Sequence, residues 1–392
     1  MFFKPASGLS DPVSQPQHAE AAAFPKRLAG ALCTPDRRKT LILCPIGLGN
    51  FLMATPGLKR LSEVLGPDNL HLLALKDSIR NLGEATEYFG QVHCWDPDKE
   101  TKRAGLRLGQ ALRREHFDYS LSLFPTGNWR FSLFAAWIGA QTKIGFAYPN
   151  ERLPAWGQTL SAPLNMTAHD TDQNYDLIRT LVGSDEDRPR ELLFPFPPRP
   201  LGSDTRKQEP YFVCHPGSSE ARGMKEKRLP PDAFAQLSRH IYREFGLRCL
   251  LIGGPEEVDI RQSIIKLAPE STAEARSDGF AGLATLIAGA RFYLGNDSGL
   301  MHVSVALQKR CIVFFGPTDE RRTGPYADGL RRGISPHLIV RRDDLRCAPC
   351  WTIHSLGKNP PCIYGDTRCL QQLELKEAWG KIRQFIRTTG LA

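Results

Sequence analysis

The sequence predicts an α/β protein with two Rossmann-like domains that face each other across a cleft. Short apolar runs typical of buried strands alternate with helical segments, which indicates βαβ units and parallel sheets. This alternation stops at a proline-dense segment, residues 186–210, and then starts again. A length of 392 residues exceeds one ordinary core, so two domains are expected.

In the first half, structure is expected to begin at Thr40, with residues 39–190 as the N-terminal domain. The strand-like runs are LILC (41–44), LHLLAL (70–75), YSLSLF (119–124) and TKIGF (142–146). Between the first two, Leu58, Leu61 and Leu65 recur at helical spacing until Gly66-Pro67 stops the pattern. Residues 1–38, rich in Ala, Pro, Ser and Gln, are predicted to be a disordered leader.

The second half repeats this pattern after a linker at 191–210. We expect a C-terminal domain over 211–375, including a cysteine-rich segment at 346–370, and a closing helix over 376–392. Its strand-like runs are YFVCH (211–215), RCLLI (248–252), RFYL (291–294) and CIVFF (311–315). A helix is predicted after Pro230 because Phe234, Leu237, Ile241 and Phe245 share one face.

Composition limits the classes of protein that fit. The chain has 51 Lys and Arg against 42 Asp and Glu, a net charge of +9, which favours an anionic partner without identifying it. No apolar run reaches the roughly 20 residues of a membrane span, and the N-terminus lacks the apolar stretch of a secretory signal. We therefore expect a cytoplasmic protein, with peripheral contact to the cytoplasmic face of the inner membrane left open.

The strand ends carry the polar residues. In open parallel sheets, ligands bind beyond the carboxyl ends of the strands. GNDSGLMH (295–302) places Asp297 and Ser298 at the start of a helix, where unpaired amides suit a pyrophosphate; a merely capped helix is the plain alternative. HPGSSEARGMKEKRLP (215–230) adds a Gly/Ser loop with cations that could stabilise a diphosphate leaving group, or else form a solvated basic loop.

Together with IGLGNFLMATPGLKRL (46–61) and the stretch 295–325, these segments resemble glycosyltransferase family 9, the lipopolysaccharide heptosyltransferase-like enzymes. The resemblance covers roughly residues 40–390. It implies a GT-B fold and inverting, metal-independent transfer of a sugar, most commonly heptose from ADP-heptose. The acceptor, on the N-terminal domain, would be the lipopolysaccharide core, another surface glycan, a lipid-linked glycan or a protein.

The resemblance also implies roles for single residues. Lys227 and Ser218, with the adjacent Ser219, would contact the diphosphate, and Glu256 the nucleoside. Asp297, Ser298, Gly299 and His302 would hold the donor sugar and phosphates. Many family members have Gly-Asp where this chain has Gly49-Asn50, and that aspartate is the expected base; the family's Trp after the basic pair is Leu229 here.

Three other functions compete with this interpretation. The substitution at Asn50 raises the alternative of a catalytically silent relative that only binds a nucleotide sugar. A dinucleotide-dependent dehydrogenase would need a third glycine where PIGLGNF has Leu52. A nucleic-acid binder would explain the positive charge and the cysteines but not the paired Gly-rich strand ends, so no nucleic-acid partner is expected.

Four of the ten cysteines crowd into one segment: Cys347, Cys350, Cys362 and Cys369. Their spacing suits four thiolates around one zinc or iron ion. A reducing cytosol disfavours a disulfide, and simple packed thiols are the other alternative. Similar sets occur in family 9, where the site is structural, so we expect a structural metal and no cofactor for catalysis.

Overall fold

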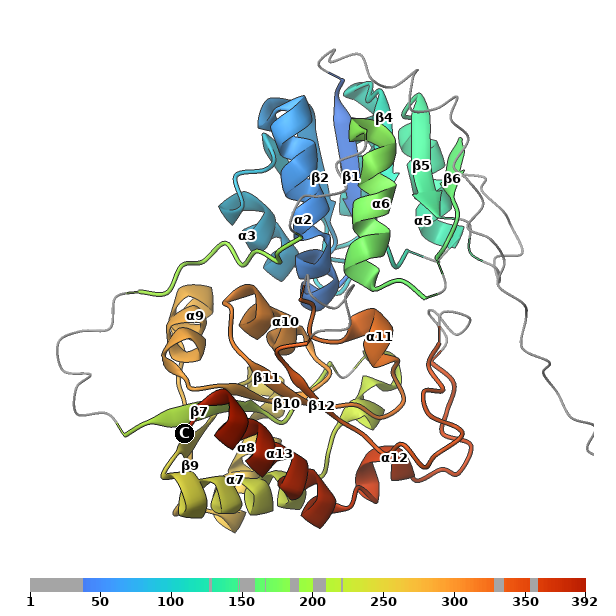
Figure 1. The fold of residues 1–392 in the computed structure, drawn as a ribbon. Coiled ribbons are helices and arrows are strands. Elements are labelled where there is room, and N and C mark those ends of the chain that lie inside the picture. Colours follow the sequence, from blue (N-terminus) through green and yellow to red (C-terminus); the bar gives the residue numbers. More distant parts are fainter. Residues whose placement is uncertain are drawn as a thin grey trace, which may run out of the picture.

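The computed structural model describes residues 38–126, 129–146, 148, 159–165, 167–183, 190–199, 209–219, 221–327, 335–352 and 359–392. They form two six-stranded, all-parallel sheets with helices on both faces, one sheet in each half of the chain (Figure 1). The predicted fold class, two facing Rossmann-like domains, is therefore confirmed. The predicted leader lies almost wholly outside the described residues and stays a prediction.

The N-terminal sheet has the strand order β3-β2-β1-β4-β5-β6. Its strands are β1 Thr40–Cys44, β2 Leu70–Ala74, β3 Gln91–Cys94, β4 Tyr119–Ser122, β5 Thr142–Phe146 and β6 Leu160–Ala162. Its helices are α2 Leu48–Leu65, η1 Pro67–Asn69, α3 Asp77–Ala85, α4 Lys102–Arg114, α5 Trp129–Ile138 and α6 Asp170–Val182. The central strand β1 is buried along its whole length, which explains its unbroken apolar sequence.

The C-terminal sheet has the order β12-β11-β10-β7-β8-β9. Its strands are β7 Tyr211–His215, β8 Arg248–Leu251, β9 Thr272–Glu274, β10 Tyr293–Asn296, β11 Cys311–Phe314 and β12 Leu338–Val340. Its helices are η3 Ala221–Lys227, α7 Pro231–Phe245, η4 Pro255–Glu257, α8 Val258–Leu267, α9 Gly279–Gly289, α10 Gly299–Ala306, α11 Glu320–Thr323, α12 Arg368–Gln371 and α13 Leu375–Thr389.

Both sheets follow the same winding, in which the first and fourth strands of the half lie side by side. In the C-terminal sheet His215 of β7 pairs in register with Gly295 of β10, and in the N-terminal sheet Leu43 of β1 pairs with Ser122 of β4. The chain leaves each such strand pair in opposite directions, so a crevice forms beyond the strand ends. The HPGSS and GNDSG segments therefore meet at one crevice.

The two domains meet through helices that start at these strand ends. Figure 1 shows α2 and α6 of the first domain above α10 and α11 of the second. The proposed boundary at 191–210 falls between the two sheets. Its described part packs on both domains, because Leu193 N–H donates to Thr55 Oγ1 on α2 and Arg199 N–H to Thr285 Oγ1 on α9. Within the described residues, no helix is long and apolar enough to cross a membrane.

Candidate functional site

Two residues that are predicted to bind the nucleotide-sugar donor, from distant parts of the chain, form an ion pair at the crevice. Lys227 ends η3, after β7, and Asp297 follows β10; Lys227 Nζ lies 2.9 Å from Asp297 Oδ2. Both side chains are nearly buried, with exposed fractions of 12% and 6%. The pair stands directly before α10, whose first amides have no partner inside the helix. A lysine and a helix N-terminus beside each other can bind a diphosphate.

A buried chain of hydrogen bonds holds the start of α10, and most of its members carry no motif that would predict them. His215 Nδ1 lies 2.8 Å from Ser298 Oγ, and its Nε2 lies 2.9 Å from Glu257 Oε2. Burial opposes ionisation of Glu257, but the hydrogen bond and charge of His215 hold its pKa below the ordinary value. Nε2 therefore donates to this carboxylate, and Nδ1 lies within hydrogen-bond distance of the Ser298 hydroxyl.

Ser298 is consequently occupied within the protein. Its Oγ also lies 3.2 Å from the Tyr293 hydroxyl, and it makes no side-chain cap bond to α10 although it is the N-cap residue. Gly217 and Gly253 allow this arrangement, since a Cβ at Gly217 would lie 1.7 Å from Glu257 Oε1. These glycines in HPG and IGG are the sequence signal for a buried group pressed against both loops.

The two predicted serines of the HPGSS loop differ in position. Ser218 is buried, and its hydroxyl donates to the Met224 carbonyl (2.8 Å) while it accepts from Arg228 Nε (3.0 Å). Ser219 is exposed. The Ser218 side chain thus fixes η3 and so positions Lys227. Its contact with a diphosphate stays a prediction.

The residues beside these loops show why near neighbours in sequence differ in role. Glu256 is exposed on η4, whereas its neighbour Glu257 is buried against His215. A nucleoside contact by Glu256 is compatible with that exposure and stays a prediction. Leu229 is buried and donates its N–H to Asn296 Oδ1 (3.0 Å). It therefore joins η3 to the end of β10.

The N-terminal domain presents the Asn50 end of α2 to this site. A Cβ at Gly49 would lie 2.6 Å from the His302 ring of α10, and a Cβ at Gly299 would lie 3.3 Å from Leu48. The first turn of α2 therefore touches the first turn of α10, with half-buried Asn50 beside the contact. His302 is buried, burial lowers its pKa to about 3, and among the described residues its Nδ1 has no hydrogen-bond partner.

A second interdomain contact was not foreseen. At the start of α6, Asp170 forms a buried ion pair with Arg322 of α11 (2.9 Å), and Tyr326 donates to Asp172 (3.1 Å). His169 Nε2 donates to the Gly324 carbonyl (3.0 Å) and its Nδ1 accepts from Thr171 N–H. Burial raises the pKa of Asp170 to about 6, against the opposing effect of Arg322, and lowers that of His169 to about 4.

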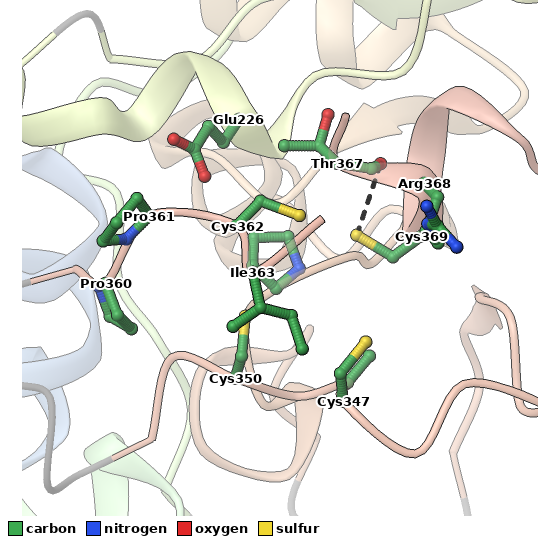
Figure 2. Close-up of a pocket in the computed structure, with 12 residues that line it drawn as sticks. Glu226, Cys347, Cys350, Pro360, Pro361, Cys362, Ile363, Thr367, Arg368 and Cys369 are labelled. Atoms are coloured by element: carbon green, nitrogen blue, oxygen red, sulfur yellow. Dashed lines mark hydrogen bonds between the residues drawn. The ribbon is translucent and has the colours of Figure 1, made fainter. Parts of the chain in front are cut away.

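The four clustered cysteines lie around one pocket. All four line one pocket of about 280 Å³, with Glu226 of η3 at its edge (Figure 2). Burial, together with the other three thiols, raises the pKa of Cys369 to about 11. As they are placed in the described part of the chain, no three Cys, His, Asp or Glu side chains could hold one metal ion. The metal therefore stays a prediction.

Comparison with known proteins agrees with this geometry. Residues 105–347 match the family model of glycosyltransferase family 9 (heptosyltransferase). Lipooligosaccharide heptosyltransferase 2 of Haemophilus influenzae is 30% identical over 126 residues, which cover 30% of this chain and only 36% of the relative. The chain thus matches about a third of that relative's length.

Solved structures show the same fold. The E. coli ADP-heptose LPS heptosyltransferase II superposes with a TM-score of 0.63 at 16% identity, over 90% of this chain and 99% of that chain. The dodecameric iron-containing heptosyltransferase TibC of enterotoxigenic E. coli, solved with ADP-D-β-D-heptose, gives 0.53 at 15% identity, over 91% and 78%. Since the family model spans more than half of its residues, the chain belongs to glycosyltransferase family 9.

Proposed function

We propose that this protein is an inverting glycosyltransferase that transfers heptose from ADP-heptose to a lipopolysaccharide core, another surface glycan or a protein, in the cytoplasm. The observation that supports it most is the Lys227–Asp297 pair at the start of α10, facing the Asn50 end of α2. The donor is inferred from relatives, whose names include ADP-heptose.

The donor side accounts for stabilisation of the leaving group. When the glycosidic bond breaks, negative charge grows on the diphosphate, and fixed positive groups near it lower the barrier. Lys227 supplies a cation held by Asp297, and α10 supplies oriented amides. The His215–Glu257 pair keeps Ser298, and with it the helix start, in one position. We therefore assign Lys227 to the diphosphate and Asp297 to the sugar hydroxyls and to Lys227.

The acceptor side lacks the family's expected base. An amide cannot accept a proton at neutral pH, and general-base assistance is typically worth 10²–10⁴-fold. A loose, oxocarbenium-like transition state needs little activation of the nucleophile early in the reaction. We propose that Asn50 orients the acceptor hydroxyl and that transfer persists without a carboxylate there. The second candidate, a silent donor-binding relative, rests on this same substitution.

A screen of nucleotide sugars tests the donor. Thermal unfolding is followed with ADP-, GDP-, UDP- and dTDP-sugars, since a ligand at 100 times its Kd stabilises the folded state by about 2.7 kcal/mol. We expect that, of these sugars, only ADP-heptose raises the melting temperature. We then expect ADP to be released when the protein is given ADP-heptose and a lipopolysaccharide core fragment truncated before one of its heptoses. Binding of another nucleotide class would contradict the donor. Binding without ADP release from any acceptor would favour the silent relative.

We also propose that Cys347, Cys350, Cys362 and Cys369 hold one structural zinc or iron ion. The chemistry of the residues supports it, because four thiols line one cavity and each can ligate as a thiolate, although the side chains would have to move closer together to share one ion (Figure 2). Iron occurs in TibC, to which this chain is similar in fold. A closed four-thiolate site leaves no open position for substrate, so the ion would stabilise the segment and take no part in transfer.

A further inference from the structure

A pocket of about 220 Å³ lies where the start of the linker meets the C-terminal domain. Three parts of the chain line this linker pocket: residues 190–192, the end of α10 with the turn that follows it, and residues 326–327 and 336–337 between α11 and β12. The donor site lies at the other end of α10, about 12 Å away along this helix of eight residues. The linker pocket is therefore separate from the donor site, and its volume suits a small ion or molecule.

The lining of the linker pocket is rich in positive charge. It contains three cations and a histidine: Arg190, Lys309, Arg310 and His337. Arg190 is ion-paired with Asp172 on α6, but Lys309 and Arg310 contact no carboxylate in the described part of the chain. Glu191, the acidic residue of the lining, is exposed and forms no ion pair with another described residue. The charge of these two cations is therefore not neutralised within the pocket.

Lys309 and Arg310 keep donors that a ligand can use. Lys309 Nζ donates to the Ala290 carbonyl after α9 (2.8 Å), and Arg310 donates to the Thr389 carbonyl at the end of α13 (2.6 Å). These two contacts are structural, because cations complement the dipole at a helix C-terminus. An ammonium has three N–H donors and a guanidinium five, however, so most of the donors remain available. Burial and the charge of Arg291 lower the pKa of Lys309, so a negative group beside it is favourable.

His337 and Arg190 add further donors. Cys311 N–H donates to His337 Nδ1 (3.1 Å), and burial together with the charge of Arg310 lowers the pKa of His337 to about 4. Near neutral pH the ring therefore carries its hydrogen on Nε2, which has no acceptor among the described residues. Arg190 is 5% exposed, and its buried Nε has no hydrogen-bond partner in that same part of the chain. A buried donor without a protein partner commonly belongs to a site for water or an ion.

We propose that the linker pocket binds a small phosphate-bearing anion, either inorganic phosphate or a phosphate monoester. Lysine, arginine and histidine surround it with N–H donors, and a phosphate has enough oxygens to accept from several of them at once. A neutral sugar would leave the two cations without a counterion. The bound anion connects Arg190, which is paired with α6, to Lys309 and Arg310 before β11, and so holds the two domains together. The site is separate from Lys227 and Asp297 and does not depend on the transfer reaction.

Titration calorimetry of the full chain with sodium phosphate and with glycerol 3-phosphate tests the proposal, with chloride keeping the ionic strength constant. Lys227→Met is measured beside wild type, because it weakens binding of phosphate groups at the donor site. We expect Lys227→Met to bind one anion per chain and to melt at a higher temperature in its presence. The tighter ligand of the two identifies the source of the phosphate group, and uncharged glycerol should not bind.

Variants of the pocket are made in the Lys227→Met chain. Lys309→Gln and Arg310→Gln should each weaken anion binding about ten- to a hundredfold, the effect of losing one charge-assisted contact. Since both side chains also contact helix ends, Gln308→Glu gives an independent test. It places a carboxylate of nearly the same shape at an exposed position of the lining, and it should weaken binding without removing a helix contact.

Gln236→Glu, the same change at an exposed position on α7, is the matched control and should leave anion binding unchanged. Absence of anion binding in Lys227→Met would overturn the proposal. So would unchanged affinity in all three pocket variants, or an equal loss of affinity in Gln236→Glu. A failed donor screen leaves this test intact, because its readout is the binding of phosphate in a chain whose donor site is already impaired.

Discussion

At the scale of single residues, the Lys227–Asp297 pair links binding and stability. Both side chains are almost buried, and removing one member of such a pair leaves the other as an uncompensated charge. A single substitution at this pair therefore changes donor binding and folding stability together. Replacing both members removes the stranded charge and keeps only the effect on binding.

We predict that Lys227→Met and Asp297→Asn each weaken ADP-heptose binding by about ten- to a hundredfold, the value of one charge-assisted contact. Both variants should stay folded but melt earlier than wild type. The double variant should recover stability and still bind weakly. Titration calorimetry and thermal unfolding check this, with Lys225→Ala, an exposed lysine of the same segment, as the control. Wild-type affinity in both single variants would place the donor elsewhere.

Asn50 gives a second prediction at this scale. Its side chain stands at the α2–α10 contact, where an acceptor hydroxyl must approach the donor. We expect Asn50→Ala to lower the transfer rate with donor affinity unchanged, because only orientation is lost. Asn50→Asp should raise the rate by supplying a base. Transfer rates with the identified donor and acceptor decide. Transfer by Asn50→Asp alone would make the natural chain a lapsed enzyme, and equal rates for wild type and Asn50→Ala would show that this position does not matter.

The positions of the polar loops can be predicted from the sequence, but the hydrogen bonds between them cannot. Lys227 and Asp297 could be named because each follows a strand in a recognisable loop. His215 and Glu257 could not, since their contacts join residues 42 and 83 positions apart and depend on which strands are neighbours. Ser298 is an example. A serine beside the start of a helix suggests a ligand contact, yet its hydroxyl is hydrogen-bonded to His215 and Tyr293.

At the scale of elements, burial decides what the sequence reveals. Central strands such as β1 and β10 are buried throughout and appear as apolar runs, and they were predicted near their observed bounds. The edge strands β3, β6, β9 and β12 were missed. β3, QVHC, is at most half-buried and β9, TAE, has three residues, so neither has a pattern that distinguishes it from a loop.

The cysteine segment gives a prediction for an element. Four thiols around one cavity should bind one equivalent of zinc or iron in protein purified without added metal. Elemental analysis measures it. Cys362→Ser should lose the metal and lower the melting temperature, whereas Cys94→Ser, outside the segment, should keep the metal. Stoichiometric metal retained in Cys362→Ser would contradict the ligand assignment, and absence of metal in wild type would favour packed thiols.

At the scale of the whole molecule, the domain interface contains two histidines that burial keeps neutral and one buried ion pair. His169 uses both ring nitrogens as a neutral ring does, donating to Gly324 and accepting from Thr171. A proton on Nδ1 would abolish the second bond. His302 is buried at the α2–α10 contact, and Asp170 is paired with Arg322. Sequence alone could not foresee these pairs, since they join residues of different domains.

The last prediction is the pH dependence of stability. Burial lowers the pKa of His302 to about 3 and of His169 to about 4, from about 6.5 in the unfolded chain. The unfolded state therefore binds more protons, and the stability that both residues contribute is complete above pH 6.5 and is lost below it. Each histidine contributes a slope of about 1.4 kcal/mol per pH unit. Burial raises the pKa of Asp170 to about 6, so below pH 6 the folded state binds a proton there that the unfolded state does not. This proton uptake stabilises the folded state and offsets the slope of about one histidine.

Denaturant unfolding at several pH values from roughly 7.5 down to 5 measures this slope. His169→Gln and His302→Gln should each flatten the profile by about 1.4 kcal/mol per pH unit, because the amide takes up no proton. His240→Gln, at an exposed position on α7, is the matched control and should leave the profile unchanged. Asp170→Asn should steepen the fall below pH 6, since its compensating proton uptake is lost. Profiles for His169→Gln and His302→Gln that parallel wild type would show that the interface histidines are not the groups that titrate.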